Sequence, residues 1–582
     1  MKREVDEIVR VSGLRYWYPG SEDPVLDGVD LNLNRGEMAV LIGPSGCGKS
    51  TLMLTLNGIV PKTVGGKIAG EVIVDGTDPL DHELAEMATR VGLVFQDPDS
   101  QLATLLVRDE VAFGLQNLRF SREEIEERTR WALELVGLDD LLMRDVFSLS
   151  GGQKQRLAIA SVLAMRPPIM VLDEPTANLD PAGADEVLTV IGDLRGRLDL
   201  TVIIVEHDIT LLAARADRLL VMDEGKIQFS GTPRDVLRAN GQTIRDELGL
   251  WIPQASEFAL ELEAAGRSIR PFPLSGNEVP ILPVATAVSE VGAPSDPPPA
   301  SQPQRADPAV LSDGVGFAYP DGTQALSEVS VEIDRGETVA LLGRNGSGKS
   351  TLSYLLAGLR TPTTGNLEIC GLSVTKSSAR QLARHVGYVF QYPEHQFVAE
   401  TVWDDLAYGP RRAGLDEAEV EKRVSDILAM FSLTGYERRH PLALSMGQKR
   451  RLSVAGTLIT RPDVLILDEP TTGQDRKNAL ALLGLLGELR ASLGLTLLII
   501  THDMRLVARF CERTIVLDCG RIVFDGGPGA LFTRIAEPGA DDMGLRVPDQ
   551  WKLARKLRSS GAQVRELADP EELGRLVAGA YR

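Results

Sequence analysis

Two glycine-rich segments carry the residue types that bind phosphate. They match the P-loop pattern G-x4-G-K-S and read Gly43-Pro44-Ser45-Gly46-Cys47-Gly48-Lys49-Ser50-Thr51 and Gly343-Arg344-Asn345-Gly346-Ser347-Gly348-Lys349-Ser350-Thr351. Glycine lets the backbone turn tightly, so that successive N–H groups point at phosphate oxygens, and the following helix adds its positive end. We therefore expect Lys49 and Lys349 to reach the β- and γ-phosphates of a nucleotide, and Ser50 and Ser350 to bind Mg²⁺.

Paired carboxylates supply the next requirement of phosphate chemistry. Asp173-Glu174 and Asp468-Glu469 each end a short apolar run. The first carboxylate of each pair is suited to hold Mg²⁺, and the second to polarise an attacking water. A solvated acidic turn at the end of a strand would explain either pair alone. Its recurrence in both halves of the chain favours catalysis.

The chain repeats itself at a nearly constant spacing, which is the feature that decides its organisation. Lys349 follows Lys49 by 300 residues, and His502 follows His207 by 295. Residues 271–308 between the copies contain ten prolines, which is typical of an extended tether. We predict a first domain over 1–270, a linker over 271–308 and a second domain over 309–582.

Local patterns indicate how each copy folds. Met38–Ile42, Ile169–Asp173 and Thr201–Val205 are apolar and rich in branched side chains, so they predict buried strands. A helix is predicted from Lys49 to Asn57, stopped by Gly58. Residues 121–166 are mostly helical in pattern. Each half is therefore predicted to be an α/β core with an inserted helical region.

Composition argues against several functional classes. The chain has 62 Lys and Arg against 82 Asp and Glu, a net charge of −20, whereas a nucleic-acid surface needs clustered basic residues. No apolar run reaches the roughly 18 residues of a membrane span, and the charged start does not resemble a signal peptide. The four cysteines form no CxxC pair, which argues against zinc and favours reduced thiols in the cytosol.

A further motif identifies the family. Leu149-Ser150-Gly151-Gly152-Gln153 lies 23 residues before Asp173, and Leu444-Ser445-Met446-Gly447-Gln448 lies 23 residues before Asp468. At this point both halves resemble the ATP-binding cassette superfamily nearly end to end. The resemblance implies two P-loop NTPase domains in tandem, each with a RecA-like core, an antiparallel β-subdomain and a helical subdomain. It also implies transport-coupled ATP hydrolysis with Mg²⁺.

The same resemblance implies roles for further residues at matching positions. Glu174 and Glu469 are general bases, His207 and His502 are switch histidines, and Gln96 and Gln391 are Q-loop glutamines near Mg²⁺. Asp180 and Asp475 are D-loop aspartates, and Tyr18 and Tyr319 stack on adenine, although Tyr16 and Trp17 lie next to Tyr18. The motifs containing Ser150, Gly152 and Gln153 or Ser445, Gly447 and Gln448 bind the γ-phosphate of ATP held by the opposite cassette.

Head-to-tail pairing of the halves would give two composite sites. Lys49 would work with Ser445, and Lys349 with Ser150, and both sites are predicted to hydrolyse ATP. The second motif departs from the family pattern at Met446, where glycine is usual. If that position required a positive φ, methionine would be strained, and we expect a modest asymmetry between the sites.

Residues after each Q-loop glutamine indicate a narrower resemblance. Phe95-Gln96-Asp97-Pro98-Asp99-Ser100-Gln101 and Phe390-Gln391-Tyr392-Pro393-Glu394-His395-Gln396 look like the ATPase subunits of energy-coupling-factor (ECF) importers, here fused. Residues 249–253 and 544–548 resemble the C-terminal extensions of those subunits. The likeness implies a peripheral position on the cytoplasmic face of the membrane and two membrane partners, a scaffold (T) subunit and a substrate-binding (S) subunit. It also implies uptake of a vitamin, a precursor or a transition-metal ion. Asp109, Glu110, Asp404 and Asp405 would face scaffold arginines, unless they are solvated acids.

Three alternatives compete with this interpretation. A tandem ATPase of a conventional sugar importer has a similar length, but its second P-loop is often degraded. A soluble ribosome-associated factor usually has a basic surface and a charged helical linker, and this chain has neither. DNA-repair cassettes would need zinc-binding cysteines or a coiled-coil insertion.

Overall fold

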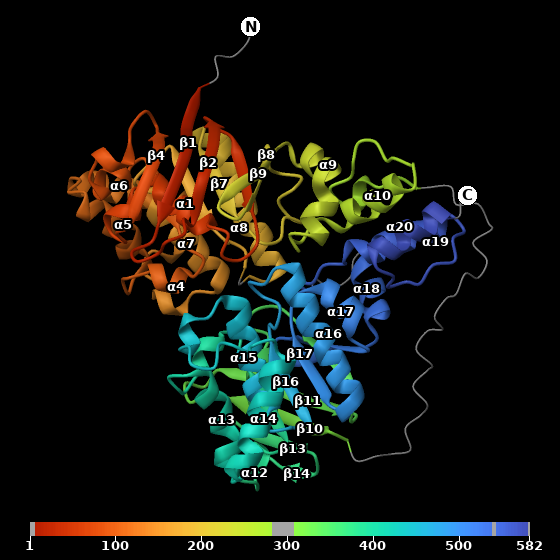
Figure 1. Ribbon diagram of the computed structural model, residues 1–582. Helices are drawn as coiled ribbons and strands as arrows, with labels where there is room; N and C mark the ends of the chain where they lie inside the picture. The colour runs from red at the N-terminus through yellow and green to blue at the C-terminus, as the bar shows by residue number, and fades with distance from the viewer. Residues whose placement is uncertain (1–5, 178, 282–307, 538–542, 580–582) are drawn as a thin grey trace. The chain divides into compact units, whose positions relative to one another are not determined.

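The chain forms two compact units in a computed structural model, Met1–Val279 and Pro280–Arg582 (Figure 1). The structure describes residues 6–177, 179–281, 308–537 and 543–579. Each unit is built on a six-stranded, mostly parallel sheet and a smaller antiparallel sheet. Because the same layers occur in both units, the predicted α/β class with two cassettes in tandem is confirmed.

The large sheet of the first unit positions its chemistry. Its strands are, in spatial order, β5 (Val91–Val94), β6 (Ile169–Asp173), β7 (Thr201–Val205), β3 (Met38–Ile42), β8 (Arg218–Asp223) and β9 (Lys226–Gly231). All neighbours are parallel except β8 and β9. The central strands are buried on both faces, which explains their continuous apolar sequence.

A small antiparallel sheet covers one side of this core. It consists of β2 (Leu26–Asn34), β1 (Glu7–Trp17) and β4 (Lys67–Val74). Side chains of both sheets share one hydrophobic cluster, which also contains Leu52 and Leu56 of the helix after the P-loop. The P-loop is thus anchored between the two sheets.

Helices complete the first unit. In chain order they are α1 (Lys49–Leu56), α2 (Ile59–Lys62), α3 (Leu84–Met87), α4 (Pro98–Gln101), α5 (Val107–Asn117), α6 (Arg122–Leu135), α7 (Gly151–Leu163), α8 (Pro181–Leu198), α9 (Pro233–Asp246) and α10 (Gln254–Ala264). Helices α5, α6 and α7 pack on one another as the inserted helical region. A capping box of Ser121 and Glu124 starts α6.

The second unit repeats these sheets. Its large sheet contains β15 (Val386–Val389), β16 (Val464–Asp468), β17 (Thr496–Ile500), β12 (Thr338–Leu342), β18 (Arg513–Asp518) and β19 (Arg521–Gly526). Its small sheet contains β11 (Gln324–Ile333), β10 (Val310–Ala318), β13 (Thr364–Ile369) and β14 (Leu372–Ser373). The short strand β14 is an addition to the arrangement of the first unit.

Helices complete the second unit as well. They are α11 (Lys349–Leu356), α12 (Ala379–Leu382), α13 (Val402–Ala413), α14 (Glu417–Met430), α15 (Met446–Leu458), α16 (Arg476–Leu493), α17 (Met504–Phe510), α18 (Pro528–Ala536), α19 (Asp549–Ser559) and α20 (Pro570–Gly579). Leu545 and Trp551 of the C-terminal extension join the core cluster of this unit, so the extension is part of the folded unit.

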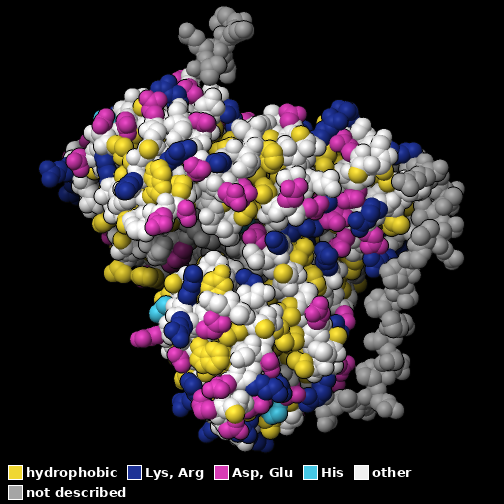
Figure 2. Space-filling model, viewed as in Figure 1, with side chains coloured by type: hydrophobic (Ala, Val, Ile, Leu, Met, Phe, Trp, Pro, Cys, Tyr) yellow, Lys and Arg dark blue, Asp and Glu magenta, His cyan; other side chains and the backbone are white. Residues whose placement is uncertain are grey.

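The local predictions agree with these elements. Strands β3, β6 and β7 and helix α1 occupy the predicted residues, and α6 and α7 fill much of 121–166. Within the described ranges, no helix is long and apolar enough to cross a bilayer. Figure 2 shows Lys and Arg side chains interspersed with Asp and Glu side chains on the visible face of each unit, in keeping with an acidic chain.

Candidate active sites

The P-loop of the first unit connects β3 to α1. Gly46 and Gly48 have φ of 84° and 106°, a left-handed conformation that favours glycine. At Gly43 a side chain is excluded, because a Cβ there would lie 2.2 Å from the Met222 carbonyl oxygen. Lys49 Nζ donates to the carbonyl oxygens of Gly43 (2.7 Å) and Pro44 (3.1 Å). The loop therefore keeps its cradle shape through bonds within the chain.

The second P-loop, between β12 and α11, has the same geometry. Gly346 and Gly348 have φ of 81° and 103°. Lys349 Nζ donates to the carbonyl oxygens of Gly343 and Arg344, each at 2.8 Å. Both units thus present the phosphate-binding loop that the sequence predicts, at the carboxyl ends of parallel strands, where α/β proteins bind ligands.

An aromatic residue lies beside each P-loop helix. The hydroxyl groups of Tyr18 and Thr51 lie 2.9 Å apart, and those of Tyr319 and Thr351 lie 3.0 Å apart. Tyr16 is fully buried, and its hydroxyl donates to the Gly65 carbonyl oxygen, whereas Tyr18 is 38% exposed. Of these two tyrosines, Tyr18 is the one available to stack on a base.

In the first unit one carboxylate brings the predicted catalytic groups together. Glu174 Oε2 accepts a hydrogen bond from Gln96 Nε2 at 2.6 Å, and its Oε1 lies 2.9 Å from His207 Nε2. Beside it, Ser50 Oγ donates to Asp173 Oδ2 at 3.0 Å. Burial and then the charge of Glu174 raise the pKa of Asp173, because both disfavour its ionised form.

The second unit achieves a similar arrangement with different partners. Glu469 Oε1 lies 2.8 Å from His502 Nδ1, and its Oε2 accepts from the hydroxyls of Thr472 (3.3 Å) and Thr501 (3.4 Å). Tyr388 donates to Asp468 Oδ2 at 2.9 Å. Burial raises the pKa of Asp468 to about 6. Tyr388 and Thr501 were not singled out from the sequence, because Leu93 and Glu206 occupy their positions in the first unit.

Both carboxylates predicted to act as general bases lie on strained backbone. Glu174 has φ of 46° and Glu469 has φ of 47°, a region that non-glycine residues rarely adopt. Each is followed by proline, Pro175 and Pro470, which restricts the preceding residue further. Backbone of this kind persists where the surrounding structure fixes it, and it is concentrated at active sites.

The signature motifs form the start of a helix in each unit. The Ser150 side chain accepts from Gln153 N, and the Gln153 side chain accepts from Ser150 N, which is a capping box at the start of α7. Ser445 and Gln448 make the same box at α15. Met446 is the first residue of α15 with a helical backbone and is 40% exposed. Met446 therefore does not need a positive φ, and the strain considered for methionine at this position does not arise.

The D-loop aspartates also cap helices. Asp180 Oδ1 accepts from Gly183 N at 2.8 Å at the start of α8, and Asp475 Oδ1 accepts from Asn478 N at 2.8 Å at the start of α16. In each unit the motif aspartate thus has a local structural role.

An ion pair that the motifs did not predict joins the Q-loop to the signature helix in both units. Lys154 Nζ lies 2.5 Å from Asp99 Oδ1, and Lys449 Nζ lies 2.9 Å from Glu394 Oε1. Burial alone would raise the pKa of the Glu394 carboxyl, but the hydrogen bond from Lys449 and its charge outweigh burial. The pKa therefore lies below its ordinary value. The repeat could have revealed this link, because both partners recur at the 295-residue spacing.

Two acids expected to face outward instead point into the protein. Glu110 Oε2 accepts from the backbone N–H groups of Ala103 (2.9 Å) and Thr104 (2.7 Å) and is buried. Asp405 Oδ1 accepts from Val398 N (2.7 Å) and Ala399 N (3.2 Å). The expectation that they meet a partner's arginines is corrected, because their carboxylates hold the loop before α5 or α13.

Glu206 makes the two sites electrostatically unequal. It is 5% exposed, and its Oε1 accepts from Thr176 Oγ1 at 2.7 Å. Burial, then the nearby charge of Glu174, raises its pKa from 4.5 to about 8. The second unit has Thr501 at this position. The protonated form of Glu206 is therefore favoured at neutral pH, and the second unit has no carboxyl at this position.

The stability of the first unit should consequently fall as pH rises from about 4.5 to 8. The unfolded carboxyl of Glu206 loses its proton near pH 4.5, whereas the folded one keeps it until about pH 8, so the unfolded state binds fewer protons across this window. Glu206→Thr should flatten this decline. Calorimetry across pH measures it, and 1 kcal/mol moves the melting temperature of a large domain by roughly 2–4 °C.

A matched control uses the other unit. Thr501→Glu should introduce the same decline into the unfolding transition of the second unit. Equal pH slopes in the wild type and in Glu206→Thr would contradict the assignment.

The donor set at each P-loop fits MgATP. Ser50 and Asp173 of the first unit provide the hydroxyl and carboxylate oxygens that Mg²⁺ prefers. Ser350 and Asp468 provide them in the second unit. Glycine N–H groups and the start of α1 or α11 provide the phosphate cradle. When bound, Mg²⁺ would neutralise charge on the phosphates.

Comparison with known proteins agrees with this geometry. The family model described as ABC transporter matches residues 26–177 and 326–472. A putative ABC transporter ATP-binding protein of Methanosarcina acetivorans is 40% identical over 576 residues, 97% of this chain and 93% of the relative. The putative HMP/thiamine import ATP-binding protein YkoD of Bacillus subtilis is 37% identical over 533 residues, 91% of this chain and 93% of the relative.

Among solved structures, cbiO1 from Clostridium perfringens is described as part of the ABC transporter complex cbiONQ. It is 34% identical, with a TM-score of 0.37, and the match covers 40% of this chain and 92% of that one. Two P-loops, two signature helices and the family match over both halves lead to one conclusion. The chain belongs to the ABC transporter family and is an ATPase with two ATP-binding cassettes that uses MgATP.

Proposed function

We propose that the chain is the fused tandem ATPase of an ECF-type importer. ABC ATPase components work with membrane subunits, and a relative that covers most of the chain is named for HMP/thiamine import. On this proposal the chain binds the cytoplasmic side of a scaffold subunit and energises uptake of a vitamin, a precursor or a transition-metal ion through a separate substrate-binding subunit.

One surface feature carries the proposal. On α5 and α13, an aromatic side chain lies one turn from an acid, Phe113 from Asp109 and Tyr408 from Asp404; the side chains of the two acids are 44% and 52% exposed. Phe113 is 47% exposed and Tyr408 is 48% exposed. Large exposed apolar side chains beside charge are typical of interaction sites.

Neighbouring loops enlarge this surface in both units. Val146 N donates to the Leu105 carbonyl oxygen at 2.9 Å, which brings exposed Leu105 close to exposed Phe147. In the second unit, exposed Leu442 occupies the position of Phe147. We infer that these surfaces receive two helices of the scaffold subunit, which would present apolar and basic side chains.

We further propose that the cassettes close head to tail on two MgATP. Lys49, Asp173, Glu174 and His207 would act with Ser445 and Gly447, and their counterparts in the second unit would act with Ser150 and Gly152. The helix starts at Ser150 and Ser445 supply N–H groups and positive helix ends suited to a γ-phosphate. Closure would pull the docked scaffold helices, and hydrolysis would release them.

Co-purification from native membranes tests this proposal. The tagged full chain should bring down a multi-spanning scaffold protein together with a small membrane protein that binds the substrate. Reversing the charge at both docking acids, Asp109→Arg with Asp404→Arg, should reduce recovery of the scaffold by more than about tenfold. The reason is that placing like charges opposite each other costs several kcal/mol. Asp193→Arg, at an exposed acid on α8, is the matched control.

Other recovered partners would decide against the proposal. A permease pair with an extracytoplasmic binding protein would indicate a conventional ABC importer. Recovery of ribosomes without membrane subunits would indicate a soluble tandem-cassette factor. Recovery of the scaffold that is unchanged by the double charge reversal would remove the docking role of α5 and α13.

A further inference from the structure

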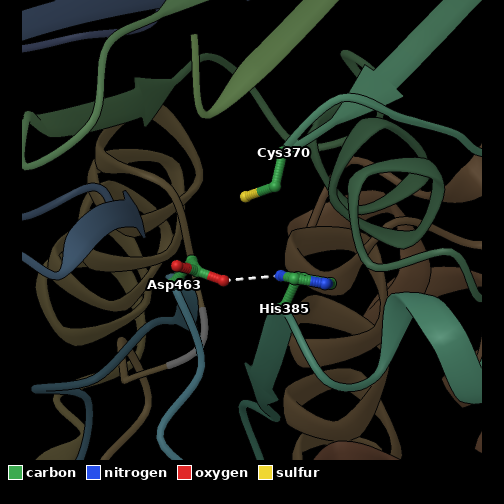
Figure 3. Close-up of side chains that lie close together, drawn as sticks. All are labelled: Cys370, His385 and Asp463. Carbon is green, nitrogen blue, oxygen red and sulfur yellow. Dashed lines mark hydrogen bonds and ion pairs between the residues drawn. The ribbon is translucent and has the colours of Figure 1, made fainter. Parts of the chain in front are cut away.

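Three side chains that can bind a metal ion meet in the second unit, away from the nucleotide chemistry (Figure 3). Cys370 lies in the turn between β13 and β14, His385 directly before β15, and Asp463 directly before β16. One sulfur, one ring nitrogen and one carboxylate oxygen all lie within 4.8 Å of one another. His385 Nδ1 is 2.6 Å from Asp463 Oδ2.

This cluster lies at the end of the core sheet opposite the P-loop. His385 and Asp463 precede the amino ends of β15 and β16, which are parallel neighbours. The P-loop and Asp468 follow the carboxyl ends of β12 and β16. The cluster is therefore separate from the ATP site and connects the small sheet, through Cys370, to the core sheet.

The first unit holds the same joint with ion pairs. The residues at the positions of Cys370 and His385 are Asp75 and Arg90. Asp75 Oδ1 lies 3.0 Å from Arg35 Nη2, and its Oδ2 lies 3.3 Å from Arg90 Nη1. Where the first unit has an acid and an arginine, the second unit has a thiol and an imidazole, which are two metal-ligand types.

We propose that Cys370, His385 and Asp463 form a binding site for one divalent ion of the zinc class. Thiolate, imidazole and carboxylate are the three ligand types that zinc takes in proteins, and solvent would complete a tetrahedron. This proposal revises the expectation, drawn from the lack of a CxxC pair, that the chain has no zinc site. It does not depend on the proposed function.

The geometry requires only small movements. Bonds of about 2.0–2.3 Å in a tetrahedral site place the ligand atoms roughly 3.3–3.8 Å apart. The His385 and Asp463 side chains would separate by about 1 Å, and the sulfur would move inward by a similar amount. The side chains of His385 and Asp463 are 36% and 41% exposed, so they have room to shift.

Arg335 supports the site instead of blocking it. Its Nη1 lies 3.3 Å from Asp463 Oδ1, which leaves Oδ2 for the ion. Such outer hydrogen bonds orient carboxylate ligands. Burial raises the pKa of the Cys370 thiol, and Arg335 opposes that effect. Binding must release the thiol proton, so affinity should rise with pH.

Cobalt binding to the reduced full chain tests the site, with Mg²⁺ in excess to occupy the carboxylates near the P-loops. We expect about one Co²⁺ per chain at micromolar concentration, with tetrahedral d–d bands and a thiolate-to-cobalt charge-transfer band, both removed by added Zn²⁺. Cys370→Ser should abolish the charge-transfer band. Cys519→Ser, at an exposed free cysteine, should leave the band intact.

A second variant distinguishes metal binding from folding. Cys370→Asp with His385→Arg copies the ion-pair joint of the first unit, so it should fold without binding cobalt. Zn²⁺ should raise the melting temperature of the wild type, because a ligand that binds only the folded state stabilises it, and should not raise that of the double variant. The proposal is overturned if the wild type shows no charge-transfer band, or if the band survives in Cys370→Ser.

Discussion

Each of the single substitutions Glu174→Gln and Glu469→Gln should lower the steady-state ATPase rate of the full chain by about 10²- to 10⁴-fold. Glutamine has the same shape but cannot accept a proton from water. In the first unit Glu174 lies between Gln96 and His207, so its carboxylate is held for this role. We expect each single variant to lose most of the total rate, because the two sites are proposed to act in one closure cycle.

Two measurements make this result interpretable. Both variants should still bind ATP, because the P-loop lysines and glycines are untouched. Glu263→Gln, at a residue of α10 that pairs with Arg238, is the matched control and should keep the wild-type rate. Full activity in either Glu174→Gln or Glu469→Gln would contradict a motor with two working sites.

A crossed pair of variants should show which signature helix completes which P-loop. In a chain that already carries both glutamine substitutions, Lys49→Ala with Ser445→Asp should still retain one ATP, because both changes fall in the same composite site. Lys49→Ala with Ser150→Asp should retain none, because the two changes fall in different sites. Aspartate keeps the helix cap, and its charge repels phosphate.

The number of ATP molecules retained per chain after rapid gel filtration gives the answer. If each signature helix completed the P-loop of its own unit, the two results would exchange. Equal retention by both variants would also rule out the head-to-tail arrangement. Circular dichroism of Ser150→Asp and Ser445→Asp checks that α7 and α15 still form.

Much of the fold could be predicted because its determinants are contiguous in sequence. The apolar runs of β3, β6 and β7 indicate buried strands, and Gly48 followed by Lys49 indicates a loop that opens a helix. Because the sequence repeats, the same patterns occur in the second half and support the same elements there. The capping boxes at Ser150 and Ser445 follow from the same short motifs, because serine and glutamine three residues apart stabilise a helix start.

Other features depend on tertiary contacts that no local pattern reveals. Asp109 and Glu110 are adjacent and chemically alike, yet the Asp109 side chain is 44% exposed whereas Glu110 is buried and holds a loop. Glu206 precedes a motif histidine, but its raised pKa arises from burial and from Glu174, 32 positions earlier. The ligands proposed around Cys370 are spread over 94 residues, so no spacing rule would have found them.

The left-handed backbone at Glu174 and Glu469 sets a conflict between folding and turnover. An L-residue in this conformation costs roughly 1–2 kcal/mol, and glycine would relieve that cost while discarding the carboxylate. Each cassette is therefore less stable than glycine at this corner would make it, and the cost falls on the residue predicted to be the general base. Substitutions that relax this strand-to-loop corner are therefore expected to be compatible with ATP hydrolysis only if they keep the carboxylate.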